Sequence, residues 1–180
     1  MYGNDYDAPI NDDTLPYDDG PEMDNELMAE LQHFAVYGNP GEPPASRVDG
    51  SRWRQRQFKD PVTASWDVSL GRADVTKLTN GFKPSEMEHK WMCCSDDPKD
   101  EGTGFEVYMY GSWGGEKRIS LQVKVPGGIG GAKEVRGEKE TGARIVGITW
   151  ERESNGGVIE EENAKETALE VCNWVLSSLA

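Results

Sequence analysis

The sequence predicts an α+β domain in which a C-terminal helix packs on one face of an antiparallel sheet of four to six strands, preceded by a disordered acidic arm. Three observations lead to this expectation. Residues 118–125 alternate polar and apolar side chains, residues 163–179 repeat apolar side chains at a helical period, and residues 1–46 hold eleven Asp or Glu but no Lys or Arg. The alternation predicts a strand with one apolar face, which must be buried. The apolar side of the C-terminal helix is expected to cover that face of the sheet. We therefore expect an arm at 1–46, a basic linker segment at 47–60 and a folded domain at 61–180.

Five segments are candidates for strands. In the clearest, Ile119, Leu121 and Val123 alternate with polar residues. The other four are rich in aromatic or branched residues, and they are Trp66–Leu70, His89–Cys94, Phe105–Tyr110 and Ala143–Glu151. Gly111-Ser-Trp-Gly-Gly predicts a tight turn between the third and fourth strands. Because segment 143–151 has apolar residues on both faces, we place it toward the sheet centre.

The end of the chain predicts a helix. Asn163 is a candidate N-cap, and Glu166 occupies the matching capping-box position. Residues with helical spacing then form one apolar face: Ala164, Ala168, Val171, Cys172, Val175 and Leu179. A short helical turn is also expected at residues 76–80.

A further amphipathic helix is expected within the arm, at about residues 22–37. Its apolar residues recur at helical spacing: Met23, Leu27, Leu31 and Phe34. Gly38 and Pro40 end it. The helix either docks on the domain or enters a groove on another protein. Gly, Pro, Asn and Asp interrupt the rest of the arm, which buries too little apolar area to offset chain entropy.

Composition excludes several classes of protein. The net charge is -14 and the mean hydropathy -0.72, and no apolar run approaches the twenty residues of a membrane-spanning helix. The first thirty residues lack the basic flank and apolar stretch of a secretory signal. Three Cys, two of them adjacent, cannot form a disulfide framework. We therefore expect an intracellular protein, cytoplasmic or nuclear, without membrane contact.

Catalytic, metal and nucleic-acid sites find little support in the sequence. His89 and Cys93 would share a strand face, but four residues at ~3.3 Å each separate them by ~13 Å, too far for a dyad. No Cys-x-x-Cys or His-x-x-x-His pair is present. The basic stretch 52–59 interleaves cations with aromatics, as nucleic-acid binders do, but the acids upstream would repel phosphate. We expect no metal, no cofactor and no nucleic-acid partner, and favour a non-enzymatic protein.

Two short motifs carry a resemblance. His89-Lys-Trp-Met and Tyr110-Gly-Ser-Trp-Gly-Gly resemble a group of small uncharacterised microbial domains with a Lys-Trp strand and an aromatic–Arg-Ser-Trp-x-Gly hairpin. The resemblance covers about residues 66–125, and Gly111 stands where that pattern has Arg. It implies no activity.

The charge distribution predicts a protein-interaction module whose acidic arm engages a basic protein partner. The expected apolar anchors are Tyr6, Tyr17, Leu27, Leu31 and Phe34, and the expected steering acids are Asp12, Asp13, Asp18 and Asp19. The alternative is a small enzyme or ligand-binding domain. Its pocket would be built from His89, Tyr108, Tyr110, Trp113 and Arg118. The oligomeric state stays open.

Overall fold

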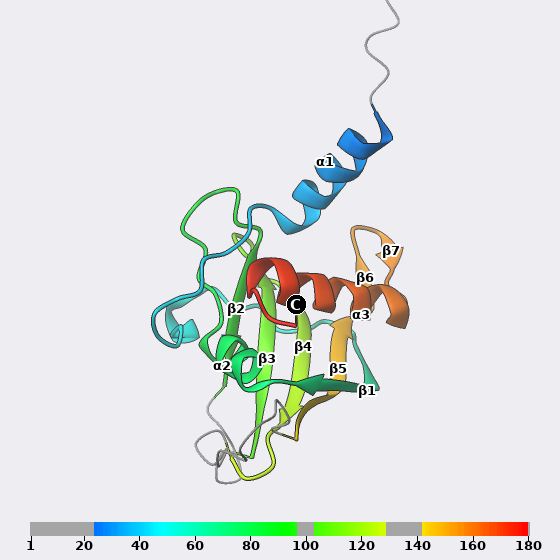
Figure 1. The fold of residues 1–180 in the computed structure, drawn as a ribbon. Helices are drawn as coiled ribbons and strands as arrows, with labels where there is room; N and C mark the ends of the chain where they lie inside the picture. The colour runs from blue at the N-terminus through cyan, green and yellow to red at the C-terminus, as the bar shows by residue number, and fades with distance from the viewer. Residues whose placement is uncertain (1–23, 97–102, 129–141, 180) are drawn as a thin grey trace, which may run out of the picture.

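A computed structural model describes residues 24–96, 103–128 and 142–179. Its centre is a five-stranded antiparallel sheet with the strand order β1-β5-β4-β3-β2 (Figure 1). The strands are β1 (Pro61–Leu70), β2 (Trp91–Ser95), β3 (Gly104–Gly111), β4 (Lys117–Lys124) and β5 (Ala143–Glu151). A small hairpin, β6 (Glu153–Ser154) and β7 (Gly157–Val158), follows β5. The predicted α+β class with an antiparallel sheet is confirmed.

Within the described residues, three α-helices accompany the sheet. They are α1 (Asn25–Tyr37), α2 (Arg72–Asn80) and α3 (Glu161–Glu170), and α3 continues into a π-helical turn, η3 (Val171–Val175). A single 3₁₀ turn, η1 (Gly50–Arg52), precedes β1. Figure 1 shows α3 and η3 lying across one face of the sheet. Among the described residues, no helix has the length and apolar character needed to cross a bilayer.

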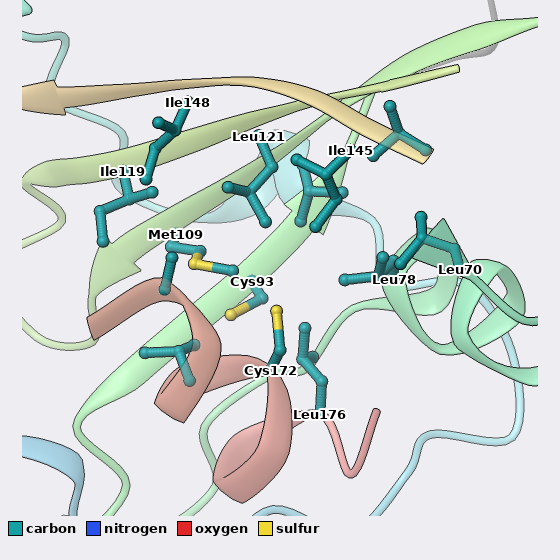
Figure 2. Packing of buried hydrophobic residues seen from close by; sticks show 14 of the residues in the cluster. Leu70, Leu78, Cys93, Met109, Ile119, Leu121, Ile145, Ile148, Cys172 and Leu176 are labelled. Carbon is teal, nitrogen blue, oxygen red and sulfur yellow. The ribbon is translucent and has the colours of Figure 1, made fainter. Parts of the chain in front are cut away.

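The core lies between this sheet face and the C-terminal helix. Figure 2 shows Cys172 of η3 pointing toward Cys93 of β2, with side chains of β4 and β5 beside them. Leu121, on the central strand, is completely buried. The apolar side of β4 predicted from residues 118–125 therefore faces the core, with Ile119, Leu121 and Val123 buried.

Strand β1 is longer than the sequence indicated, since it begins at Pro61 and not at Trp66. It lies at the sheet edge and pairs along its length with β5, with Val62 opposite Trp150. Proline is tolerated there because the first residue of an edge strand needs no ladder donor. Strand β5 lies between β1 and β4, so its placement inside the sheet is confirmed.

The predicted boundaries of the C-terminal helix were wrong at both ends. Helix α3 begins at Glu161 with Glu160 at the N-cap, and Asn163 is an exposed residue of its first turn. The acids at 160–162 favour this earlier start because they lie at the positive end of the helix dipole. The helix stops at Val175 rather than Leu179, whose backbone N–H donates to Asp74. The turn expected at 76–80 is the end of α2.

Residues 47–60 cross the second face of the sheet. The Val48 N–H donates to the Asn80 carbonyl, and the Lys117 N–H donates to the Arg56 carbonyl. Val48 and Trp53 pack on a small apolar cluster of Met92, Cys94 and Tyr110. This segment is therefore held against the domain at several points.

Candidate interaction surface

Helix α1 projects from the body of the protein (Figure 1). None of its residues is buried. Leu27, Leu31 and Phe34 are 45%, 49% and 41% exposed, although all three are large and apolar. They follow one another at i, i+4 and i+7, so they form one continuous stripe on the helix. We call these three residues the α1 stripe.

The last turn of α1 docks on the C-terminal helix. The Nε2 atom of His33 lies 2.7 Å from a carboxylate oxygen of Glu170, and its ring meets the Trp174 ring edge-on at 4.8 Å. Tyr37 packs against the main core and hydrogen-bonds with the side chain of Thr167. Burial raises the pKa of the Tyr37 phenol above its ordinary value. These contacts fix the position of the helix at its C-terminal end.

Two indole groups hold the chain where α1 ends. The Trp91 Nε1–H donates to the carbonyl of Val36 at 3.0 Å, and the Trp174 Nε1–H donates to the carbonyl of Gly38 at 2.9 Å. Gly38 has a φ of 69° and a ψ of -153°, a region open essentially to glycine alone. A Cβ at this position would lie 2.0 Å from the Glu88 carbonyl oxygen. Glycine is therefore required for this close approach.

Docking leaves the α1 stripe uncovered for a geometric reason. Each helical residue turns the side-chain direction by about 100°, so His33 and Tyr37 point roughly 100° away from Leu27, Leu31 and Phe34. The side that contacts Glu170 and Trp174 is thus a different side from the stripe. The sequence left open whether this helix docks on the domain or serves a partner. The structure shows that one side docks and the apolar side does not.

The described part of the arm is acidic. Asp24, Glu26 and Glu30 lie in or beside the first turns of α1, and residues 24–46 contain no Lys or Arg. The Asp24 side chain caps the helix by accepting from the Glu26 N–H at 3.2 Å. The projecting surface therefore combines an apolar stripe with negative charge.

Beside α1 lies a groove of about 1060 Å³, bounded by α1, the β3–β4 turn, the β6–β7 hairpin and α3. Core residues Trp91, Ile119 and Trp150 reach its base. Lys90 and Arg118 line the side formed by the start of β2 and the β3–β4 turn, and Glu153 lines the side formed by the hairpin. The groove thus has an apolar base, and its walls mix cations with acids: Arg56, Lys59, Lys90, Lys117 and Arg118 with Asp60, Glu116, Glu151 and Glu153.

The structure separates the five residues expected to build a ligand pocket. Trp113 and Arg118 line the groove. Tyr108 and Tyr110 lie on the second sheet face, where the Lys117 ammonium sits 4.3 Å from the Tyr108 ring centroid. His89 does not line the groove, and its Nδ1 accepts from the backbone N–H groups of residues 85 and 86 at 3.1 and 3.2 Å.

Electrostatics on the second sheet face follow from burial. Burial and the adjacent Glu106 raise the pKa of Tyr108, whose hydroxyl donates to that carboxylate at 2.7 Å. Burial also lowers the pKa of Lys117. The raised pKa of Cys94, about 11, has the same main cause. The raised pKa values keep the Tyr108 phenol and the Cys94 thiol protonated at neutral pH.

Among residues 24–96, 103–128 and 142–179, no three His, Cys, Asp or Glu side chains gather closely enough to hold a metal ion. Cys93 and Cys172 are completely buried, and burial raises the pKa of both thiols. Such thiols are poor nucleophiles because they stay protonated.

Six of the expected partner-binding residues lie outside the described residues, namely Tyr6, Asp12, Asp13, Tyr17, Asp18 and Asp19. Sequence reasoning missed the residues that anchor α1, which are His33, Tyr37, Trp91 and Trp174. The i, i+4 spacing of His33 and Tyr37 was the available signal, and their rings indeed lie 4.7 Å apart.

Comparison with known proteins adds no relative: no protein-family model matches the chain, and neither does any curated protein or solved structure. The resemblance to small microbial domains stays a prediction from two motifs.

Proposed function

We propose that this protein is a protein-interaction module in which the α1 stripe is the principal binding face. The supporting observation is that Leu27, Leu31 and Phe34 are exposed on a helix whose other side is docked. Helices that enter a partner's groove use apolar anchors at this spacing. The partner is expected to offer an apolar groove.

The energetics favour binding at this face. Fully burying a Leu or Phe side chain contributes about 1.5–3 kcal/mol. Anchoring of the last turn through His33 and Tyr37 orders the helix before a partner arrives. A partner therefore pays less ordering entropy than it would for a free peptide.

The charge of the arm favours a basic partner. Residues 1–46 carry eleven acids and no Lys or Arg, whereas the remaining residues are nearly balanced. Charge complementarity raises association rates by 10- to about 1000-fold, and salt screens it. Basic side chains around the partner's apolar groove would complement Asp24, Glu26 and Glu30.

A small enzyme or ligand-binding site at the five predicted pocket residues has weaker support. Trp113 and Arg118 share the groove, but Tyr108 and Tyr110 lie on the other sheet face. His89 is engaged with the backbone of residues 85 and 86.

The experiment is site-specific photo-crosslinking in the cells that make the protein. A photoreactive residue replaces Leu31 in the full chain, and the matched control places it at Met87, which is 78% exposed outside the helix. We expect a crosslink to one basic protein from position 31 but not from position 87. A crosslink to a second copy of this chain, to an acidic protein, or equally from both positions contradicts the proposal.

The identified partner then allows an affinity test. Leu27→Ala, Leu31→Ala and Phe34→Ala should each weaken binding about tenfold, or 1.4 kcal/mol, as expected for buried apolar anchors. Met87→Ala is the control and should leave the affinity unchanged. Titration calorimetry at two salt concentrations measures both the loss and the electrostatic contribution. Equal affinity of all four variants would contradict the assignment of the α1 stripe.

A further inference from the structure

Two cations of the groove form no salt bridge among the described residues, although the nearby Glu116 carboxylate acts electrostatically on one of them, Arg118. Lys90 and Arg118 both line the groove, and no carboxylate of the described residues lies within salt-bridge distance of either. The Arg118 guanidinium instead lies over the Trp91 ring, 5.2 Å from its centroid. A guanidinium in this position keeps its N–H groups for a planar acceptor such as a carboxylate.

The local backbone explains why Arg118 occupies this position. A Cβ on Gly111 would lie 3.0 Å from the Arg118 Nη2 atom and 3.0 Å from a Glu116 carboxylate oxygen. Glycine at 111 therefore leaves the space that both side chains use. Glu116 pairs with Arg56 at 3.8 Å and also acts electrostatically on Arg118. Because no salt bridge holds Arg118, its guanidinium can still bind a further acid.

An apolar surface lies next to these cations. Trp113, in the β3–β4 turn, is 55% exposed at the rim, with its ring centroid 6.1 Å from that of Trp53. The buried side chains of Trp91, Ile119 and Trp150 form the base. The groove therefore fits an extended segment that alternates acids with aromatic or aliphatic residues.

Residues 1–23 combine acids with aromatic and aliphatic residues, and they join the described chain close enough to the groove to reach it. They contain seven acids and no Lys or Arg, together with Tyr2, Tyr6, Ile10, Leu15 and Tyr17. They join α1 at Asp24, and about twelve residues of helix, ~18 Å long, separate this point from Val36 in the groove wall. An extended chain covers that distance in about six residues. Residues before about position 18 can therefore reach the groove.

We propose that residues 1–23 bind in the groove of their own chain, with aspartates at Lys90 and Arg118 and a tyrosine against Trp113. Covalent attachment gives the segment an effective concentration on the order of millimolar, so modest affinity is sufficient. This contact is independent of the α1 stripe and does not require the proposed partner. It has one consequence for such a partner: a basic protein must displace the aspartates from Lys90 and Arg118 before it can use them.

The test is paramagnetic broadening in the full chain. Asp12→Cys supplies an attachment site for a nitroxide, and the native thiols of Cys93 and Cys172 are buried and stay unlabelled. Labelling is done briefly at neutral pH, where burial also protects Cys94. We expect loss of intensity for the amide signals of Lys90, Ser112 and Trp113, and none for those of Ser69 and Leu70, which lie at the end of β1 away from the groove. The intensity should return at ~1 M salt, where the Debye length falls from about 10 Å at 0.1 M to about 3 Å.

Charge variants make the result specific. Lys90→Glu combined with Arg118→Gln should abolish the broadening, whereas Lys124→Glu, an exposed lysine at the other end of β4, should leave it unchanged. A second variant leaves the groove intact and replaces Asp5, Asp7, Asp13, Asp18 and Asp19 with Asn. This variant should also abolish the broadening. Because it leaves the domain unchanged, its result cannot be explained by a folding defect of the groove.

Three results would overturn the proposal. The first is unbroadened signals in the groove of the labelled wild-type background. The second is broadening that persists in both charge variants. The third is equal broadening when labelled chains are mixed with unlabelled, isotope-enriched chains, because the occupant would then be a second copy.

Discussion

The indole N–H of Trp174 donates a hydrogen bond to the carbonyl oxygen of Gly38 at 2.9 Å, and the same indole ring receives His33 edge-on. Trp174 belongs to η3, whereas Gly38 ends α1. A single side chain of the core helix therefore fixes both the end and the last turn of the projecting helix. The direction in which the α1 stripe faces depends on this contact.

Replacing Trp174 with Phe should loosen α1 without unfolding the domain. The variant keeps an aromatic ring but leaves the buried Gly38 carbonyl without this donor, which costs about 1–3 kcal/mol. Urea unfolding measures the loss, and hydrogen exchange should show faster amides in the last turn of α1. Trp66→Phe is the matched control, since Trp66 is also half-buried and its ring lies beside Lys165. Equal exchange of α1 in both variants would contradict the prediction.

Gly38→Ala should lower the free energy of unfolding strongly, whereas Gly156→Ala should lower it only by the strain of a positive φ. Both glycines have positive φ, 69° and 80°. A Cβ at Gly156 meets nothing within 4 Å, but one at Gly38 meets the Glu88 carbonyl at 2.0 Å. We expect about 1–2 kcal/mol at position 156 and at least twice that at position 38. Similar denaturation midpoints for the two variants would mean that the close approach of Gly38 to Glu88 is not needed.

Truncation of two leucines should change the stability by very different amounts. Leu121→Ala, in the centre of the core, is expected to cost about 2–5 kcal/mol. Leu31→Ala, in the α1 stripe, should change the stability of the isolated protein by no more than about 0.5 kcal/mol. Guanidinium unfolding gives both values. A loss above 2 kcal/mol for Leu31→Ala would indicate that the stripe is buried against the same chain.

Stability should decrease above pH 9. Burial raises the pKa of Cys94 from 9.0 to about 11 and that of Cys172 to about 12. Between pH 9 and the raised pKa of each thiol, the unfolded chain releases a proton that the folded chain keeps. The free energy of unfolding therefore falls as the pH rises. One such group contributes at most about 1.4 kcal/mol per pH unit. The stability is fully present below pH 9.

Urea midpoints from pH 7.5 to 11, under reducing conditions, test this dependence. Cys94→Ala should give a shallower decline than the wild type, because one of the titrating thiols is gone. Tyr108 and Tyr110 contribute in the same direction above pH 10, since burial raises the pKa of both. A wild-type midpoint that stays constant over this range would contradict the assigned burial of the thiols.

Most of the fold could be predicted because its signals are local. Alternation in β4 and the apolar face of the C-terminal helix both report burial directly, and both predictions are confirmed. Helix α1 ends where Gly38 predicted. The start of α3 was misjudged because several acids and Asn163 could each begin a helix, and only packing of Ala164 and Ala168 selects among them.

The arrangement of the candidate sites could not be predicted in the same way. Arg118 contacts Trp91, and Trp174 contacts Gly38, across large separations in the sequence. Neither pair follows from spacing along a helix or strand. The five expected pocket residues were chosen for their chemistry. Plain alternation would place Arg118 on the same face as Ser120, which lies opposite Tyr108, but a register shift between Met109 and Tyr110 pairs Tyr110 with Lys117 and leaves Arg118 on the face of Trp91.

The sheet, its covering helix, the amphipathic character of α1 and the separation of charge follow from the order of the residues, because hydrophobic periodicity and charge are properties of contiguous residues. The side on which α1 docks became known from the folded protein, and so did the groove that Lys90, Trp113 and Arg118 form with the end of α1. These arrangements depend on where η3 and the β3–β4 turn lie in space relative to α1. That placement results from packing of the whole core around Cys93, Leu121 and Cys172.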